Sequence, residues 1–386
     1  MLDDASRLRL GCLIERDTFA SNVVTAGLML LYGYAQLAVG MFAAYVATHG
    51  ESYATLDALC RWDCGWYSSI VTDGYSYAPS GHGYADAANW AFWPLFPLLV
   101  GTLGSWLSLS FAHAGLLLNV IALFALNLTV LQFGSAMFEA RRHRVGFLLL
   151  FVSSPFYFYL QIPYGEAVFS LLLVVSFLSW SGGYLATAGI SGVLMTATRP
   201  HGLFWAVSLA LAVLINVRFN THRAVVDHYA RALTIALMPL GALAYLVYLW
   251  DLTGDILAYP HVLRAWGRVA GLSILQFFDD DLGMIALRAY WLLGGAAALP
   301  LVVWLLRRER FRAIGIFALM TFAISVLSKI ESLPRYMWTM PLLYVPLYEV
   351  CRSRARIAPI YAFAALLFLM KLFLIYAWND GQKWVI

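Results

Sequence analysis

Residues 22–47 read NVVTAGLMLLYGYAQLAVGMFAAYVA and contain no charged side chain. A helix needs about 20 mostly apolar residues to cross the hydrocarbon core of a bilayer, so this run is long enough to span it. The rest of the chain has the same character: 62% of its residues are hydrophobic and 12% are charged. Soluble domains usually have about 25% charged residues. The sequence therefore predicts a membrane protein.

Ten further apolar runs follow, and arginine-rich connections alternate with them. The predicted spans are 22–47, 112–133, 145–161, 164–181, 184–198, 202–217, 232–252, 284–306, 313–330, 336–351 and 358–378. Cytoplasmic loops carry an excess of Lys and Arg, so the arginine clusters set the orientation. This rule places the N-terminus in the cytoplasm and predicts an all-α polytopic membrane protein with about eleven spans. We expect one domain over 1–386, because no polar tract is long enough for a soluble one.

Two larger loops, 48–111 and 253–283, are predicted on the non-cytoplasmic side. The apolar run 90–108 lies within the first loop and carries Pro94 and Pro97, which disfavour a regular spanning helix. If it crossed the membrane, the cluster Arg141–Arg144 would fall on the same side as the long loop. We therefore expect this run to lie along the membrane surface or to re-enter it.

The first external loop contains RWDCGWY, residues 61–67, where a carboxylate and a guanidinium stand among three large aromatic side chains. A carboxylate within hydrogen-bond reach of a hydroxyl can act as a general base, so Asp63 is the candidate catalytic residue. Trp62, Trp66 and Tyr67 offer flat faces to a sugar ring or a lipid chain, although membrane-interface anchoring explains such aromatics equally well.

Other charged residues are predicted near the same membrane edge, where orientation signals do not explain arginines. Arg199 lies at the helix-breaking sequence Arg199–Gly202, and Arg335 follows a proline. One interpretation is internal ion pairing, for example between Arg199 and Glu166. The other is recognition of an anionic head group, since the guanidinium fork suits phosphate. The candidate binding residues are Arg61, Trp62, Trp66, Tyr67, Tyr164, Glu166, Arg199, His201, Arg264, Arg335 and Tyr336.

Several site types are disfavoured. No metal-ligand cluster of His and Cys is visible, and the acidic triplet Asp279–Asp281 is best explained as a solvated loop. A disulfide between Cys60 and Cys64 is possible but awkward within a helix, so the favoured interpretation is two small interfacial residues. The arginine clusters are explained by membrane orientation, so no nucleic-acid partner is expected. There is no Gly-rich phosphate loop.

Six blocks, in order, resemble the PIG-V-like mannosyltransferases. They are Arg61-Trp62-Asp63-x-x-Trp66-Tyr67 with Gly74-Tyr75, Phe92–Leu99, Ser154–Phe156 through Pro163–Glu166, Ala197–Leu203, Gly254-Asp255 with Trp266 and Arg268, and Pro334–Tyr336. Some positions depart from the family pattern: Trp93 and Phe96 replace other aromatics, and Gly165 and Ala167 flank Glu166 differently. The blocks run from about residue 61 to residue 336.

This resemblance implies a GT-C glycosyltransferase that transfers mannose from a polyprenyl-phosphate donor to an acceptor hydroxyl, with inversion. It also implies that Asp63 is the base, that no metal or other cofactor is required, and that the site lies on the periplasmic or extracellular face of the cell membrane. The acceptor, a glycan, a lipid or a protein, stays open. The alternative is a multi-span transporter or lipid flippase, which the short and broken helices and the arginines within apolar sequence favour. The lack of a visible internal repeat disfavours that alternative.

Overall fold

The computed structural model describes residues 18–48, 56–79, 87–219, 225–268, 282–354 and 357–382. The prediction for Asp279–Asp281 falls outside these ranges, as do residues 1–17 and the part of the second external loop over 269–281. Within them the structure contains helices, turns and irregular segments, and no strand. This confirms the all-α prediction.

The α-helices are α2 (Phe19–Ala47), α3 (Asp63–Asp73), α4 (Leu95–Leu107), α5 (Phe111–Phe133), α6 (Arg141–Ser153), α7 (Glu166–Gly182), α8 (Leu185–Thr198), α9 (Gly202–Phe219), α10 (Val225–Leu237), α11 (Leu240–Thr253), α12 (Ala258–Leu263), α13 (Leu282–Ala296), α14 (Leu299–Leu306), α15 (Arg312–Ser328), α16 (Leu333–Trp338), α17 (Tyr344–Arg354) and α18 (Ile357–Asn379). Short 3₁₀ helices lie between them: η1 (Leu56–Leu59), η2 (Asn89–Ala91), η3 (Gly134–Ala136), η4 (Pro155–Leu160), η5 (Arg264–Trp266), η7 (Glu309–Phe311) and η8 (Pro341–Leu343).

Five helical segments are long and apolar enough to cross a membrane: Phe19–Ala47, Phe111–Ala136, His228–Thr253, Gly283–Leu306 and Glu309–Ser328. Other apolar helical segments are shorter, among them α7, α8 and the Ala365–Asn379 part of α18. The chain is thus a multi-span membrane protein, and the count of eleven spans stays a prediction.

Prolines set several boundaries that the apolar pattern alone does not mark. The predicted span 145–161 ends as an α-helix at Ser153, because Pro155 opens the 3₁₀ helix η4. The span 232–252 is split between α10 and α11 at Pro239, and the span 336–351 is interrupted by η8 at Pro341. The break at Arg199–Gly202 between α8 and α9 is confirmed.

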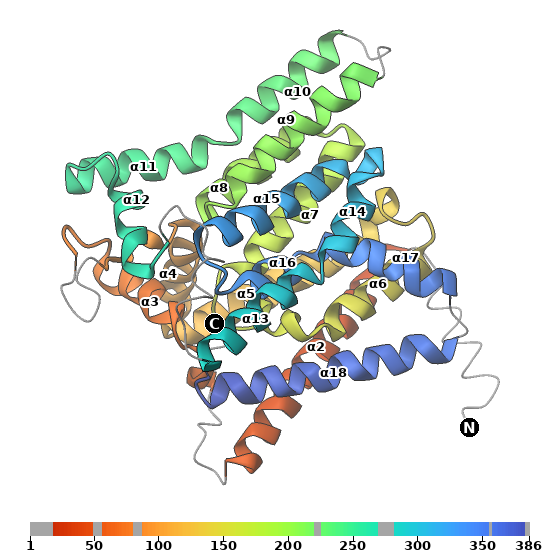
Figure 1. Ribbon diagram of the computed structural model, residues 1–386, viewed down its shortest axis with the longest axis horizontal. Helices are drawn as coiled ribbons and strands as arrows, with labels where there is room; N and C mark the ends of the chain where they lie inside the picture. The colour runs from red at the N-terminus through yellow and green to blue at the C-terminus, as the bar shows by residue number, and fades with distance from the viewer. Residues whose placement is uncertain are drawn as a thin grey trace.

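The helices form a bundle whose two ends differ (Figure 1). The short elements α3, α4 and α12 gather at one end, on the left of the view, while α6 and α17 lie toward the other. Inside the bundle α7 packs against both α5 and α8, and α15 packs against α9, α14 and α16.

In the first loop the segment after η2 becomes α4, which is too short to cross a bilayer as a straight helix. Its course relative to the membrane stays a prediction.

Candidate active site

Four charged side chains meet where helices begin or end. Asp63 is the first residue of α3, Glu166 is the first residue of α7, and Arg199 follows the last residue of α8. Carboxylates are favoured at helix N-termini and cations at C-termini by the peptide dipoles. Arg335, in the short helix α16, lies between the two carboxylates. Helix polarity therefore favours Asp63, Glu166 and Arg199 at these positions, and Arg335 is held by its pairs with the two carboxylates.

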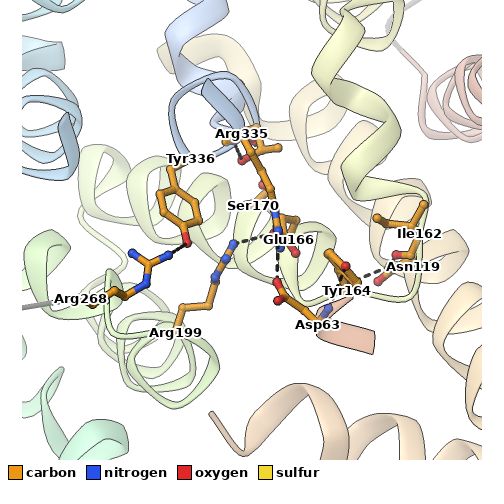
Figure 2. Close-up of polar contacts among 11 residues, drawn as sticks. Asp63, Asn119, Ile162, Tyr164, Glu166, Ser170, Arg199, Arg268, Arg335 and Tyr336 are labelled. Carbon is orange, nitrogen blue, oxygen red and sulfur yellow. Dashed lines mark hydrogen bonds and ion pairs between the residues drawn. The ribbon is translucent and has the colours of Figure 1, made fainter. Parts of the chain in front are cut away.

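These four side chains form one connected network (Figure 2). Arg335 donates from Nε to Oε1 of Glu166 at 2.6 Å and pairs through a terminal nitrogen with Oδ2 of Asp63 at 3.1 Å. Arg199 pairs with the same Glu166 oxygen at 3.0 Å. The side chains of Glu166 and Arg335 are 1% and 4% exposed, whereas that of Asp63 is 29% exposed. Glu166 is thus the buried centre of the network and Asp63 is its accessible end.

Asp63 is presented by a tight turn. Cys64 N donates to Arg61 O at 3.1 Å, and Trp62 occupies the second position with φ 53° and ψ −112°. These angles match the first central residue of a type II′ turn, a position that normally takes glycine. A non-glycine residue in such a conformation costs about 1–3 kcal/mol and persists only where its surroundings hold it. The backbone just before Asp63 is therefore strained.

A disulfide between Cys60 and Cys64 closes this turn. The interpretation of the two cysteines as small interfacial residues was wrong. It assumed that both lie within one helix, but α3 begins only at Asp63, so Cys60 lies before the helix and its Cα comes within 5.2 Å of that of Cys64. This separation lies within the usual range for bridged cysteines.

Tyr164 fixes the same turn from the other side. Its hydroxyl donates to Arg61 O at 2.7 Å and accepts from Asp63 N at 3.2 Å. Asn119 in turn donates its side-chain amide to the carbonyls of Ile162 and Tyr164. The guanidinium of Arg335 lies over the Tyr164 ring, 4.6 Å from its centroid. Tyr164 therefore acts on the Asp63 backbone and on the Arg335 side chain, and does not line the cavity described next.

A cavity of about 300 Å³ opens beside the network. Asp63 and Arg199 lie in its wall, together with Arg268 from the segment after η5. The other lining residues are mostly aromatic or apolar: Tyr67, Ala91, Phe92, Trp93, Thr198, Pro200, His201, Phe204, Tyr259, Leu263, Trp266, Ile324, Ser325, Ser328 and Tyr336. Ligand sites are commonly apolar hollows with a few convergent polar groups. This cavity combines one accessible carboxylate with two cations.

Arg268 differs from the other two arginines in its partners. Its guanidinium donates to the Tyr336 hydroxyl at 2.8 Å. Within the described part of the chain it makes no ion pair with a carboxylate. Gly267, with φ +64°, turns the backbone between η5 and Arg268. Arg264, the predicted binding residue in this segment, is exposed and is not among the residues that line the cavity. The sequence places both arginines in one loop and does not show which one turns inward.

His201 and Tyr336 form a third part of the wall. Their rings lie 4.9 Å apart, and the guanidinium of Arg199 lies 5.3 Å from the Tyr336 centroid. His201 stands in the turn between α8 and α9, where burial and then the charges of Arg199 and Arg268 lower its pKa to about 3. It is therefore neutral at physiological pH.

Gly202 ends this turn because a side chain has no room there. A Cβ at this position would come within 2.6 Å of the Met195 carbonyl carbon and of Thr196 N. Backbone atoms cannot yield as a flexible side chain can. The tight crossing of α8 and α9 that places Arg199 and His201 thus requires glycine.

The remaining predicted site residues lie away from the cavity or behind its wall. Arg61 points toward the C-terminal helix and donates to Asn379 O at 2.8 Å. Trp62 is 38% exposed and does not line the cavity. Trp66 packs against Phe92 and Trp266, which do line it. Of the opening RWDCGWY block, Asp63 and Tyr67 therefore reach the cavity.

Among the described residues, no group of three or more His, Cys, Asp or Glu side chains is placed to hold a metal ion. The acidic triplet Asp279–Asp281 lies outside those residues. Independence from a metal stays a prediction.

No protein-family model matches the chain, and no curated protein matches its sequence. Solved structures of the Archaeoglobus fulgidus oligosaccharyltransferase are similar in part. The complex with Zn and sulfate aligns over 82% of this chain and 48% of its own, with a TM-score of 0.48 and 16% identity. The apo form aligns over 91% and 56%, with a TM-score of 0.48 and 13% identity. A complex of the same enzyme, AglB, with an inhibitory peptide and a dolichol-phosphate aligns over 91% of this chain and 56% of its own, with a TM-score of 0.45 and 13% identity. The chain spans about half the length of these proteins.

Proposed function

We propose that the protein is a membrane glycosyltransferase of the GT-C type, which transfers a sugar from a lipid-phosphate donor to an acceptor hydroxyl at the cavity. One observation carries this proposal. The blocks that resemble the PIG-V-like mannosyltransferases are scattered from residue 61 to residue 336, and five of the six supply residues to one cavity. The remaining block, which ends at Pro163–Glu166, does not line the cavity. Its Tyr164 bonds the backbone of Asp63, and its Glu166 accepts from Arg335. Short sequence matches that arose by chance would not be expected to lie around one cavity in the folded chain.

Asp63 acts as the general base in this proposal. Its carboxylate takes the proton of the acceptor hydroxyl while the acceptor oxygen attacks the anomeric carbon and the bond to the lipid phosphate breaks. Arg335 pairs with one carboxylate oxygen at 3.1 Å, which orients the group. Attack from the face opposite the leaving group inverts the anomeric carbon.

Arg268 receives the phosphate. Arg199 and Arg335 already pair with carboxylates, whereas Arg268 contacts the neutral Tyr336 hydroxyl. Its charge is therefore the one that is least compensated in the cavity wall. A guanidinium that meets the phosphate oxygens stabilises the charge that develops as the sugar leaves, an effect often of a few kcal/mol.

The finer features of the proposal rest on the sequence resemblance. They are mannose as the sugar, a polyprenyl-phosphate donor, catalysis without a metal, and a site on the periplasmic or extracellular face with the N-terminus in the cytoplasm. The aromatic lining suits a sugar ring, because aromatic faces pack against its C–H groups.

Activity with purified protein tests the proposal. The protein in detergent is incubated with polyprenyl-phosphate mannose and a panel of glycan, glycolipid and peptide acceptors, and donor and product are separated by mass. Acceptor-dependent loss of donor with release of polyprenyl phosphate supports glycosyl transfer. Movement of the intact donor across proteoliposome membranes, with no product formed, would instead support the transporter or flippase alternative.

A further inference from the structure

We propose that the Cys60–Cys64 disulfide is a positioning element for the catalytic carboxylate, so that transfer requires this bond to be formed. This inference rests on the proposed role of Asp63 as the base. Catalysis by Asp63 then depends on the redox state of Cys60 and Cys64, which do not line the cavity.

The first argument is the place of the bond in the chain. The disulfide joins residues four positions apart and encloses Arg61, Trp62 and Asp63. Asp63 is thus inside the closed loop, one residue before the buried Cys64. A constraint on this loop acts directly on the backbone that aims the carboxylate.

The second argument is the conformation that the loop must hold. Trp62 occupies the glycine position of the II′ turn, with φ 53°. A free chain with tryptophan at this position would relax to negative φ, which rotates the peptide that leads into Asp63. The disulfide spans this residue and shortens the loop to the length of the turn. It is the only covalent restraint on the turn among the described residues.

The third argument comes from the noncovalent contacts around the turn, which all depend on its shape. The Tyr164 hydroxyl bonds both Arg61 O and Asp63 N, which requires these two atoms to face the same point. Arg335 meets Asp63 Oδ2 at 3.1 Å. A relaxed turn separates the two Tyr164 partners and moves the carboxylate away from Arg335. Opening the disulfide therefore weakens a set of contacts and not a single one.

The redox chemistry is ordinary thiol–disulfide exchange. A dithiol such as dithiothreitol supplies two electrons and two protons, leaves the two cysteines as thiols, and departs as its own cyclic disulfide. Re-formation requires a disulfide of a small molecule or of a protein oxidant, which is reduced in turn. Structural disulfides persist in oxidising compartments, which agrees with the predicted non-cytoplasmic position of this loop.

The bond itself is tested without any activity measurement. Arg61 lies between the two cysteines, so trypsin cleavage after Arg61 in the denatured, alkylated protein leaves two fragments that only the disulfide joins. We expect these fragments to migrate together until dithiothreitol is added. Fragments that separate without reductant would overturn the proposal, whatever the enzyme does.

The functional test compares the double variant Cys60→Ala/Cys64→Ala with Cys351→Ala. Cys351 is a free cysteine on α17, toward the other end of the bundle. A displacement of about 1 Å at a reacting group can lower the rate about 100-fold. We expect such a loss of kcat in the double variant, with donor KM little changed because Arg268 and Tyr336 are untouched, and no loss in Cys351→Ala.

Adding Trp62→Gly to the double variant separates positioning from general stability. Glycine adopts φ > 0 without strain, so we expect it to restore part of the lost kcat. If the double variant does not fold, reversible loss of wild-type activity on treatment with dithiothreitol, followed by the same fragment assay, measures the same dependence. Full kcat in the reduced wild type or in the double variant would overturn the proposal. A wild-type protein that is inactive with every donor would refute the proposed function. The fragment assay would still show whether the disulfide is present.

Discussion

Replacing Glu166 by Gln removes the charge at the centre of the buried network. Glu166 accepts from Arg335 and pairs with Arg199 at 3.0 Å, and its side chain is 1% exposed. A pair of unit charges about 3 Å apart attracts by about 5 kcal/mol at an effective dielectric constant of about 20. Much of that attraction offsets the desolvation of the charges. Because Arg335 keeps Asp63 while Arg199 loses its carboxylate, we expect a net loss of about 3–5 kcal/mol in the free energy of unfolding.

Chemical denaturation in detergent micelles measures this loss, with two variants for comparison. Asp63→Asn removes an equal charge from the accessible end of the network and leaves the Arg335–Glu166 pair intact, so its effect should be smaller. Glu349→Gln breaks the exposed pair of Glu349 with Arg352, which should change stability by less than about 1 kcal/mol. If Glu166→Gln unfolds no more easily than Glu349→Gln, the charge of Glu166 does not stabilise the fold.

Four further predictions follow from the cavity and its supports. Arg268→Gln should raise the donor KM at least about 10-fold, and Arg264→Gln should leave it unchanged. Steady-state kinetics with varied donor concentration measures both, and equal effects would contradict the assignment of the phosphate to Arg268. Tyr164→Phe should lower kcat more than it raises KM, because it removes the hydroxyl that bonds Arg61 O and Asp63 N; an unchanged kcat would contradict its positioning role. Gly202→Ala should destabilise the protein in thermal unfolding, because its Cβ meets backbone atoms at 2.6 Å; wild-type stability would show that α8 and α9 can separate there. Folding lowers the pKa of His201 from 6.5 to about 3, so the unfolded state binds the proton first. Acidification below pH 6.5 should therefore lower the free energy of unfolding more steeply in the wild type than in His201→Gln. Equal slopes of that free energy against pH would count against a buried neutral histidine.

The helical membrane fold could be predicted because the bilayer demands long uncharged runs, and such runs are visible in a sequence. Residues 22–47 became most of α2 and residues 112–133 most of α5. The finer division was harder, because the apolar pattern continues through a proline. Pro239 lies within a uniformly apolar run, and it still divides α10 from α11.

The candidate site was predictable in its members and less so in their roles. Charges inside an apolar chain are costly, so Arg199, Glu166 and Arg335 stood out. Ion pairing of Arg199 with Glu166, one of the two interpretations, is present in the structure. Arg268 was not separable from Arg264, because the choice depends on the turn at Gly267. The disulfide was misjudged because it depends on where α3 begins, and helix boundaries are set by local turns that a hydrophobic pattern does not show.

The most direct test of the central claim is the transfer rate of Asp63→Asn. Asparagine keeps the size of the side chain and removes its ability to take a proton. With the variant folded, as judged by its size-exclusion profile and thermal unfolding, and with donor still bound, we predict that kcat falls by at least about 100-fold. A folded Asp63→Asn variant that turns over at close to the wild-type rate would contradict the assignment of Asp63 as the base.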